Sequence, residues 1–121
     1  MSLFQRIWAS PGSSGTVTSV NAKEASTRLK SAQPPFILDV RQPEEFRDEH
    51  IAGAHLIPLG ELERRMNELP RDREILCVCR SGARSSSAAR RLAEMGFKVN
   101  NLSGGMIGWM QARLPVEHGS R

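Results

Sequence analysis

The most informative segment of this 121-residue chain is Ile75-Leu76-Cys77-Val78-Cys79-Arg80-Ser81-Gly82-Ala83-Arg84-Ser85. Its first four residues are apolar and predict a short buried strand, and residues 86–95 predict a helix. Cys79 therefore lies at a strand-to-helix turn. A loop that wraps around one side chain at such a turn can direct several backbone N–H groups at it, and the helix adds the positive end of its dipole.

Cys79 is the candidate nucleophile of this segment. The backbone N–H groups and the charges of Arg80 and Arg84 favour a thiolate over a thiol, so we expect the pKa of Cys79 to fall from about 8.5 to roughly 5–7. Gly82 is expected to adopt a backbone conformation that is closed to larger side chains, and Ser85 to cap the helix or to donate to the sulfur. The segment thus predicts an anionic sulfur at neutral pH.

The loop Cys-Arg-Ser-Gly-x-Arg-Ser is similar to the active-site loop of many single-domain rhodaneses, which are sulfurtransferases. Three further segments are similar to motifs of the same family and follow the family's order along the chain. They are Asp39-Val40-Arg41 with Pro43-Glu44-Glu45-Phe46, Glu49-His50-Ile51-Ala52-Gly53-Ala54 with Ile57-Pro58, and Leu102-Ser103-Gly104-Gly105-Met106-Ile107-Gly108-Trp109. The second departs from the family pattern at Glu49 and Ala52, where glycine and proline are usual. The resemblance covers about Thr18 to Leu114.

Patterns along the rest of the chain predict alternating strands and helices. Strands are expected at 36–40, 55–57, 75–78 and 98–102, and helices at 21–30, from 42, at 59–69, at 86–95 and at 106–112. Asn21 followed by Glu24 fits a capping box at the first helix. This order, like the resemblance, implies an α/β fold with a small, mainly parallel sheet flanked by helices on both faces, and it places Cys79 at the carboxyl end of a strand, where such sheets bind ligands.

The expected organisation of the chain has three parts. Residues 1–15 are expected to be a flexible arm and linker, residues 16–115 a rhodanese-like domain, and residues 116–121 a tail.

The resemblance also implies roles for the residues of the loop. Cys79 is expected to take a sulfane sulfur from thiosulfate or a persulfide donor, to carry it as a persulfide, and to pass it to a thiophilic acceptor, which is cyanide in the family's assay. Arg84, and Arg80 beside it, are expected to hold the anionic end of the donor. The expected substrate-binding loop comprises Arg80, Ser81, Gly82, Ala83, Arg84 and Ser85. No metal and no cofactor are expected.

Other residues are expected to support the loop rather than to react. Asp39, Arg41 and Glu49 form this group, with Arg41 pairing with Glu49 or with another acid beneath the loop. Cys77 is expected to be a buried strand residue, and a role as a resolving thiol stays the alternative. Gly104-Gly105 is expected to form a turn.

Two other functions stay open at this point. One is a non-catalytic interaction module on the same fold, although such modules commonly lack the cysteine that is present here. The other is a phosphatase-like anion-binding enzyme, because rhodaneses resemble the dual-specificity phosphatases. The loop of those phosphatases has one more residue between the cysteine and an essential arginine, so Arg84 would be out of register for a phosphoryl group.

Composition sets wider limits on function. Seventeen Lys and Arg against thirteen Asp and Glu give a formal net charge of +4, which suits a small anionic donor or an acidic donor or acceptor protein. Two Trp and four Phe are too few aromatic residues for a nucleic-acid stacking surface. The apolar residues near the amino terminus form too short a run for a membrane span or a signal sequence, and the three His show no metal-ligand spacing. Because two cysteines at this spacing form no disulfide framework, we expect a reducing compartment and a cytoplasmic protein. From the aromatic count and the short apolar run we expect neither nucleic-acid nor membrane partners.

Overall fold

The computed structural model describes residues 17–120, so the arm expected at residues 1–15 lies outside the described residues. Five parallel strands form one sheet in the order β1-β5-β4-β2-β3. The strands are β1 (Thr18–Val20), β2 (Phe36–Asp39), β3 (His55–Leu56), β4 (Ile75–Val78) and β5 (Val99–Leu102). The helices are α1 (Ala22–Leu29), α2 (Pro43–Asp48), α3 (Ala83–Glu94), α4 (Gly105–Gln111) and the 3₁₀ helices η1 (Leu59–Glu61) and η2 (Glu63–Glu68).

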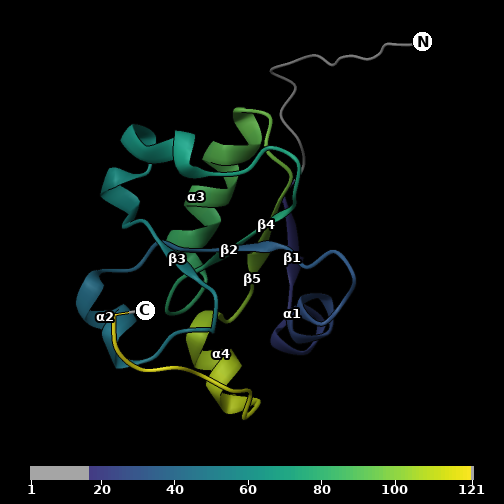
Figure 1. Cartoon of the computed structure of the whole chain (residues 1–121), viewed down its shortest axis with the longest axis vertical. Coiled ribbons are helices and arrows are strands. Elements are labelled where there is room, and N and C mark those ends of the chain that lie inside the picture. Colours follow the sequence, from purple (N-terminus) through teal and green to yellow (C-terminus); the bar gives the residue numbers. More distant parts are fainter. Residues whose placement is uncertain (1–16, 121) are drawn as a thin grey trace.

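The direction of each connection decides which face of the sheet its helix covers. The connections from β1 to β2 and from β2 to β3 step one way across the sheet, and those from β3 to β4 and from β4 to β5 step back. Because parallel connections are right-handed, the two sets lie on opposite faces. Accordingly α3 with η1 and η2 covers one face, and α1 with α4 covers the other (Figure 1). The expected fold class is confirmed.

This topology positions Cys79. Cys79 directly follows β4, the middle strand of the sheet. The chain that follows β4 crosses the face covered by α3, whereas the chain that follows the neighbouring strand β2 crosses the opposite face. Ligands of open α/β sheets bind in the crevice at such a reversal. The carboxyl ends of β2 and β4 are therefore the place to look for a functional site.

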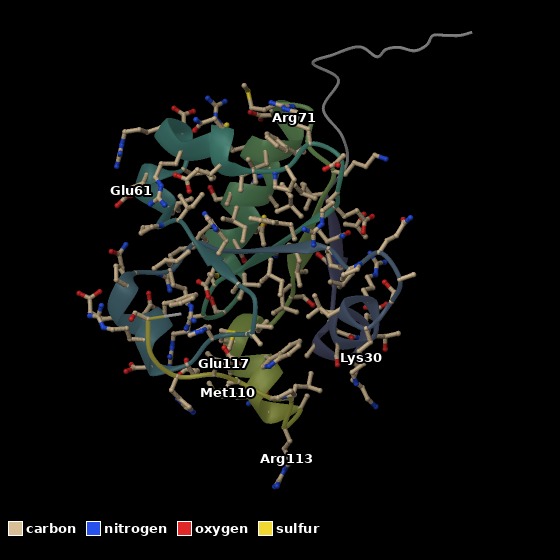
Figure 2. All side chains as sticks on the ribbon, viewed as in Figure 1. Lys30, Glu61, Arg71, Met110, Arg113 and Glu117 are labelled. Carbon is tan, nitrogen blue, oxygen red and sulfur yellow. The ribbon has the colours of Figure 1, made fainter. Side chains whose placement is uncertain are left out.

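Side-chain alternation along the strands builds a core on each face. Ile75 and Cys77 of β4 belong to the core beneath α3, and Leu76 and Val78 belong to the core beneath α1 and α4. A strand that is buried on both sides carries a continuous apolar run, which is why 75–78 is recognisable in the sequence. The charged ends of Lys30 and Arg113 point outward into solvent (Figure 2).

At the helix ends, one predicted signal is confirmed and one predicted boundary is shifted. At α1, Glu24 N–H donates to Asn21 Oδ1 over 2.8 Å and Asn21 N–H donates to Glu24 Oε1 over 2.9 Å, which is the predicted capping box. The helix after Cys79 begins at Ala83, earlier than the predicted residue 86, because Gly82 adopts a φ of +103° and leads directly from the loop into the helix.

The prediction at 59–69 is wrong in helix type. Two 3₁₀ helices occupy this range, with a break at Arg65, where φ is −117° and ψ is 16°. Two of the apolar steps, from Leu59 to Leu62 and from Met66 to Leu69, span three residues, which is the repeat of a 3₁₀ helix. β1 is not among the predicted strands; its three residues include one buried side chain, Val20.

Candidate active site

Cys79 is enclosed by the loop that follows β4, and it is 0% exposed. Gly82 N–H donates to its Sγ over 3.1 Å, and Ser85 Oγ lies 3.3 Å from the same atom. Burial raises the pKa of this thiol, but the Ser85 hydroxyl and the backbone N–H groups of Ser85, Gly82 and Ser81 lower it by more. The pKa of Cys79 therefore lies below its ordinary value, in the direction that the sequence analysis expects.

The first turn of α4 holds the loop in this shape. Met106 N–H donates to Cys79 O over 2.9 Å, and Ile107 N–H donates to Arg80 O over 3.1 Å. The C=O and N–H of a trans peptide point in opposite directions. Because the Arg80 carbonyl faces α4, the Ser81 N–H faces the sulfur.

Gly105 allows this close approach between α4 and the loop. A Cβ at this position would lie 2.4 Å from Arg80 O and 2.5 Å from Cys79 O, and the φ of Gly105 is +54°. Both the contact and the backbone conformation require glycine. The turn expected at Gly104-Gly105 is present, and it has the further task of shaping the loop around Cys79.

Arg84 is held by a carboxylate outside the loop. Its Nη1 and Nη2 donate to Glu45 Oε1 and Oε2 over 2.9 and 2.8 Å, so a bidentate ion pair joins α3 to α2. The pair lowers the pKa of Glu45 to about 2, against the effect of burial. The pKa of Arg84 is raised by Glu45 and, to a smaller extent, by the charge of Cys79. The guanidinium is therefore close enough to the sulfur to act on it electrostatically.

Arg80 differs from Arg84 in its surroundings. Its side chain is exposed, and among residues 17–120 it makes no side-chain hydrogen bond or ion pair. The exposed rim of the loop also includes Ser81 and Ala83, whereas Gly82 and Ser85 are buried beside the sulfur. The structure thus brings all the predicted loop residues around Cys79 and divides them into an inner set and a rim.

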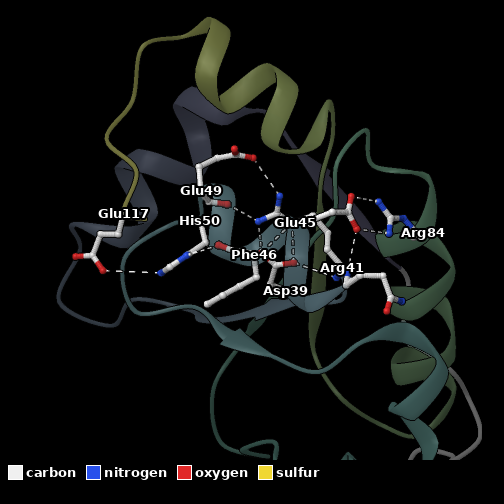
Figure 3. A network of polar contacts seen from close by, with 9 residues as sticks. Asp39, Arg41, Glu45, Phe46, Glu49, His50, Arg84 and Glu117 are labelled. Atoms are coloured by element: carbon white, nitrogen blue, oxygen red, sulfur yellow. Dashed lines mark hydrogen bonds and ion pairs between the residues drawn. The ribbon is translucent and has the colours of Figure 1, made fainter. Parts of the chain in front are cut away.

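Arg41 is completely buried in a network of acids (Figure 3). Its Nη2 donates to Asp39 Oδ2 over 2.9 Å and to the Glu49 carbonyl O over 2.6 Å, and its Nη1 donates to Glu49 Oε2 over 3.3 Å. The Arg41 backbone N–H donates to Asp39 Oδ1 over 3.0 Å. The structure places the three residues together, where they tie the end of β2 to the end of α2.

Cys77 and the three histidines lie outside the loop. Burial in the sheet and the nearby Cys79 raise the pKa of Cys77 to about 12, so this thiol stays protonated. The His50 ring stacks on Phe46 at 3.8 Å, and His55 Nε2 lies 2.8 Å from Glu68 Oε1. Among residues 17–120, no cluster of His, Cys, Asp and Glu is arranged to bind a metal ion.

A hollow of about 950 Å³ lies at the opposite end of the sheet from Cys79. It is lined by residues that precede β2, β4 and β5, including Gln33, Arg73 and Lys98, and by none of the loop residues. The candidate site is therefore inferred from the chemistry of the loop at the carboxyl ends of the strands and not from the size of a hollow.

Two residues of the site are not identified by the sequence analysis. Glu45 is interpreted there only as part of a helix start, and its pairing with Arg84 spans 39 positions. Asn101 of β5 lies 2.6 Å from Ser85 Oγ through its Oδ1. The signal for Asn101 is present in the sequence, because two consecutive asparagines interrupt a predicted buried strand, where polar residues are unusual.

Comparison with known proteins identifies the family. Residues 21–112 match the family model for the rhodanese-like domain. The chain belongs to this family. A sulfurtransferase of Allochromatium vinosum is 36% identical over 101 residues, which cover 83% of this chain and 94% of that protein. The thiosulfate sulfurtransferase GlpE of Vibrio cholerae is 31% identical over 99 residues, which cover 81% of this chain and 91% of that protein.

Solved structures agree with the family assignment. The crystal structure of a rhodanese-related protein from Thermoplasma volcanium matches with a TM-score of 0.78 at 31% identity, over 83% of this chain and 97% of that chain. Several other relatives are longer, and this chain spans between 42% and 59% of their length. The rhodanese-like domain therefore also occurs as a part of larger proteins.

The predicted domain limits, residues 16 and 115, enclose the matched range and stay a prediction. Beyond residue 115, Glu117 pairs with His50 through backbone hydrogen bonds of 2.8 and 2.9 Å, so this part of the predicted tail contacts the rhodanese-like domain. Within the part of the chain that the structure describes, we find no helix with the length and apolar character needed to cross a membrane.

Replacing Gly105 by Ala is expected to destabilise the domain strongly. The new Cβ would overlap the carbonyls of Cys79 and Arg80, so the loop or α4 must move. We expect a loss of about 2–4 kcal/mol in the free energy of unfolding, measured by urea denaturation. Gly60→Ala is the matched control, because a Cβ there meets nothing within 4 Å and φ is not positive. Equal stability of the two variants would contradict this role of Gly105.

Replacing Asp39 by Asn is expected to leave the Arg41 charge buried without its main partner. Breaking a buried ion pair in this way costs about 3–5 kcal/mol in the free energy of unfolding. Glu49→Gln should cost less, because the Glu49 side chain is 17% exposed and its backbone carbonyl still accepts from Arg41. Denaturant unfolding of both variants tests the order, and a smaller loss for Asp39→Asn would show that Arg41 does not depend on Asp39.

Proposed function

We propose that this rhodanese-like domain is a sulfurtransferase that carries a sulfane sulfur on Cys79. The observation that carries the proposal is the enclosure of the Cys79 sulfur by N–H and O–H donors, with Gly82 N–H at 3.1 Å and a lowered pKa. Such a sulfur is a nucleophile without a neighbouring base. The relatives named sulfurtransferase support the class of reaction.

In the first half of the proposed reaction, the Cys79 thiolate attacks the sulfane sulfur of the donor. A new S–S bond forms to Sγ, and the S–S bond inside the donor breaks. With thiosulfate the electron pair leaves on sulfite, which needs no proton. With a persulfide donor it leaves on the donor's thiolate. The product on the protein is a Cys79 persulfide.

In the second half, a thiophilic acceptor attacks the outer sulfur of this persulfide. The bond between the two sulfurs breaks, and its electron pair returns to Cys79 as a thiolate. The donors around Sγ stabilise this leaving thiolate, just as they stabilise the starting one. One set of hydrogen bonds therefore serves both halves of the cycle, and the cycle is redox-neutral for the protein.

The two loop arginines are assigned different tasks in this proposal. Arg84 contributes a fixed positive field near the sulfur while Glu45 holds it. Arg80 is exposed and carries the charge that meets the anionic end of a small donor or an acidic partner protein. A phosphatase is disfavoured because a phosphoryl dianion needs an arginine directed into the loop, whereas the guanidinium of Arg84 is bound on two nitrogens by Glu45.

The thiolate of Cys79 is expected to form at a pH below the ordinary cysteine pKa of about 8.5. Because donors around Sγ lower this pKa, the ultraviolet absorbance of the thiolate should rise with pH in a step below that value and fall away as the solution is acidified through it. Cys77 should add no step in this range, since its pKa is about 12. The step should vanish in Cys79→Ser and persist in Cys77→Ala. A step that persists in Cys79→Ser would place the anionic sulfur elsewhere.

Persulfide formation on Cys79 can be followed by intact-mass spectrometry of the reduced protein. We expect the mass to increase by one sulfur atom after treatment with thiosulfate or a small persulfide, and to return after cyanide, because the first step transfers one sulfur atom to Sγ and the second removes it. Cys79→Ser should gain nothing at nearly unchanged thermal stability, and Cys77→Ala should still gain the sulfur. Gain of sulfur by Cys79→Ser, or no gain by the folded wild-type protein with either donor, would refute the proposed function.

A further inference from the structure

Three buried polar groups form a chain behind the loop. Asn101 of β5 is 6% exposed, and Ser85 and Cys79 are 0% exposed. Asn101 Nδ2 donates to Gly82 O over 3.1 Å. Ser85 Oγ lies 2.6 Å from Asn101 Oδ1 and 3.3 Å from Cys79 Sγ. β5 pairs with β4 in a register that sets Asn101 opposite Cys77, so the sheet itself fixes the position of the amide.

The Gly82 carbonyl fixes the orientation of the Asn101 amide. A carbonyl oxygen can only accept a hydrogen bond, so the NH₂ group of Asn101 faces Gly82 and its Oδ1 faces Ser85. Oδ1 and a thiolate sulfur are both acceptors without a hydrogen to give. The Ser85 hydroxyl between them has one hydrogen, and it cannot donate along both directions.

We propose that Asn101 is a positioning residue that competes with the Cys79 sulfur for the single hydroxyl hydrogen of Ser85. When Ser85 donates to the sulfur, its oxygen and Asn101 Oδ1 face each other at 2.6 Å with no hydrogen between them, which is unfavourable in a buried site. When Ser85 donates to Asn101, the sulfur has lost one donor. Asn101 therefore weakens the stabilisation of the thiolate by Ser85.

The consequence for the proposed sulfur transfer is a more reactive sulfur. Nucleophilicity of a thiolate falls as its pKa falls, so a thiolate that is stabilised too well attacks slowly. Once Sγ bears a second sulfur, the negative charge lies mainly on the outer atom, and the Ser85 hydroxyl is free to donate to Asn101 instead. The inference rests on the proposed function for this consequence, whereas the competition itself is a property of the resting protein.

The test is the thiolate titration of Asn101→Leu, which has a similar size and no hydrogen-bonding group. Freed from competition, Ser85 donates to the sulfur alone, and the measured pKa of Cys79 should fall by about 0.5 to 1. Asn101→Val is the second variant and should give the same sign if the leucine variant does not fold. An asparagine that only braced the loop through Gly82 would give the opposite sign, because a loosened loop loses N–H donors and the pKa rises.

A double-mutant cycle isolates the role of the Ser85 hydroxyl. In a Ser85→Ala background there is no hydrogen to compete for, so Asn101→Leu should no longer lower the pKa of Cys79. Asn100→Leu is the matched control on the same strand. Asn100 is adjacent to Asn101 in β5, so its side chain lies on the opposite face of the sheet, and its Nδ2 donates to Glu74 Oε1 over 3.4 Å. Its replacement should leave the pKa of Cys79 unchanged.

Sulfur loading supplies a second readout. At a pH above both pKa values, persulfide formation by Asn101→Leu should be about two- to threefold slower than in the wild-type protein, as the lower basicity requires. A pKa that is unchanged or raised in both Asn101 variants overturns the inference, whatever the loading assay shows. Because the titration needs no donor or acceptor, it stands even if the wild-type protein accepts no sulfur, which would overturn the proposed function alone.

Discussion

The packing of backbone against backbone between α4 and the loop after β4 is the contact on which the rest of the site depends. The N–H groups of Met106 and Ile107 donate to the carbonyls of Cys79 and Arg80. Glycine at position 105 allows the close approach of α4 and the loop. A loop of peptides has as many carbonyls as N–H groups. The loop can direct its N–H groups at a central anion only when donors outside the loop form hydrogen bonds with its carbonyls. Here those donors belong to α4, which begins at the same edge of the sheet as the loop.

The charged residues around the loop are arranged so that most of their charge is cancelled locally. Asp39 and Glu49 surround Arg41, and Glu45 neutralises Arg84. Burying a guanidinium costs free energy unless acids accompany it, and these pairs also connect β2, α2 and α3 at the reversal point of the sheet. These ion pairs support the loop, whereas Arg80, which makes no ion pair among residues 17–120, is exposed at its rim.

Much of the fold could be predicted from the sequence because its signals are local. The run at 75–78, the cysteine after it and the capping box at Asn21 all depend on residues within a few positions of one another. The site could be predicted only in outline. The partners of Arg84 and Ser85 lie in α2 and β5, far from the loop in the sequence. The periodicity of apolar residues predicts whether a segment is a helix or a strand, but it does not predict which residues of two segments are in contact. The helix type at 59–69 is not predicted because apolar steps of three and four residues occur together in this range, a pattern that also fits an α-helix.

The main chain supplies most of the hydrogen-bond donors to Cys79. The reactivity of the sulfur and the choice of its donor or acceptor therefore depend on different residues. The N–H groups of Ser81, Gly82 and Ser85 are present whatever the side chains at the rim, and the Ser85 hydroxyl is buried, so substitutions at the rim leave the donors to the sulfur in place. The side chains of Arg80, Ser81 and Ala83 are exposed around it. Substitutions there can alter which donor or acceptor is admitted while the nucleophile keeps its character. A fold of this kind can diversify its partners by changing a few surface residues, without having to rebuild its chemistry each time.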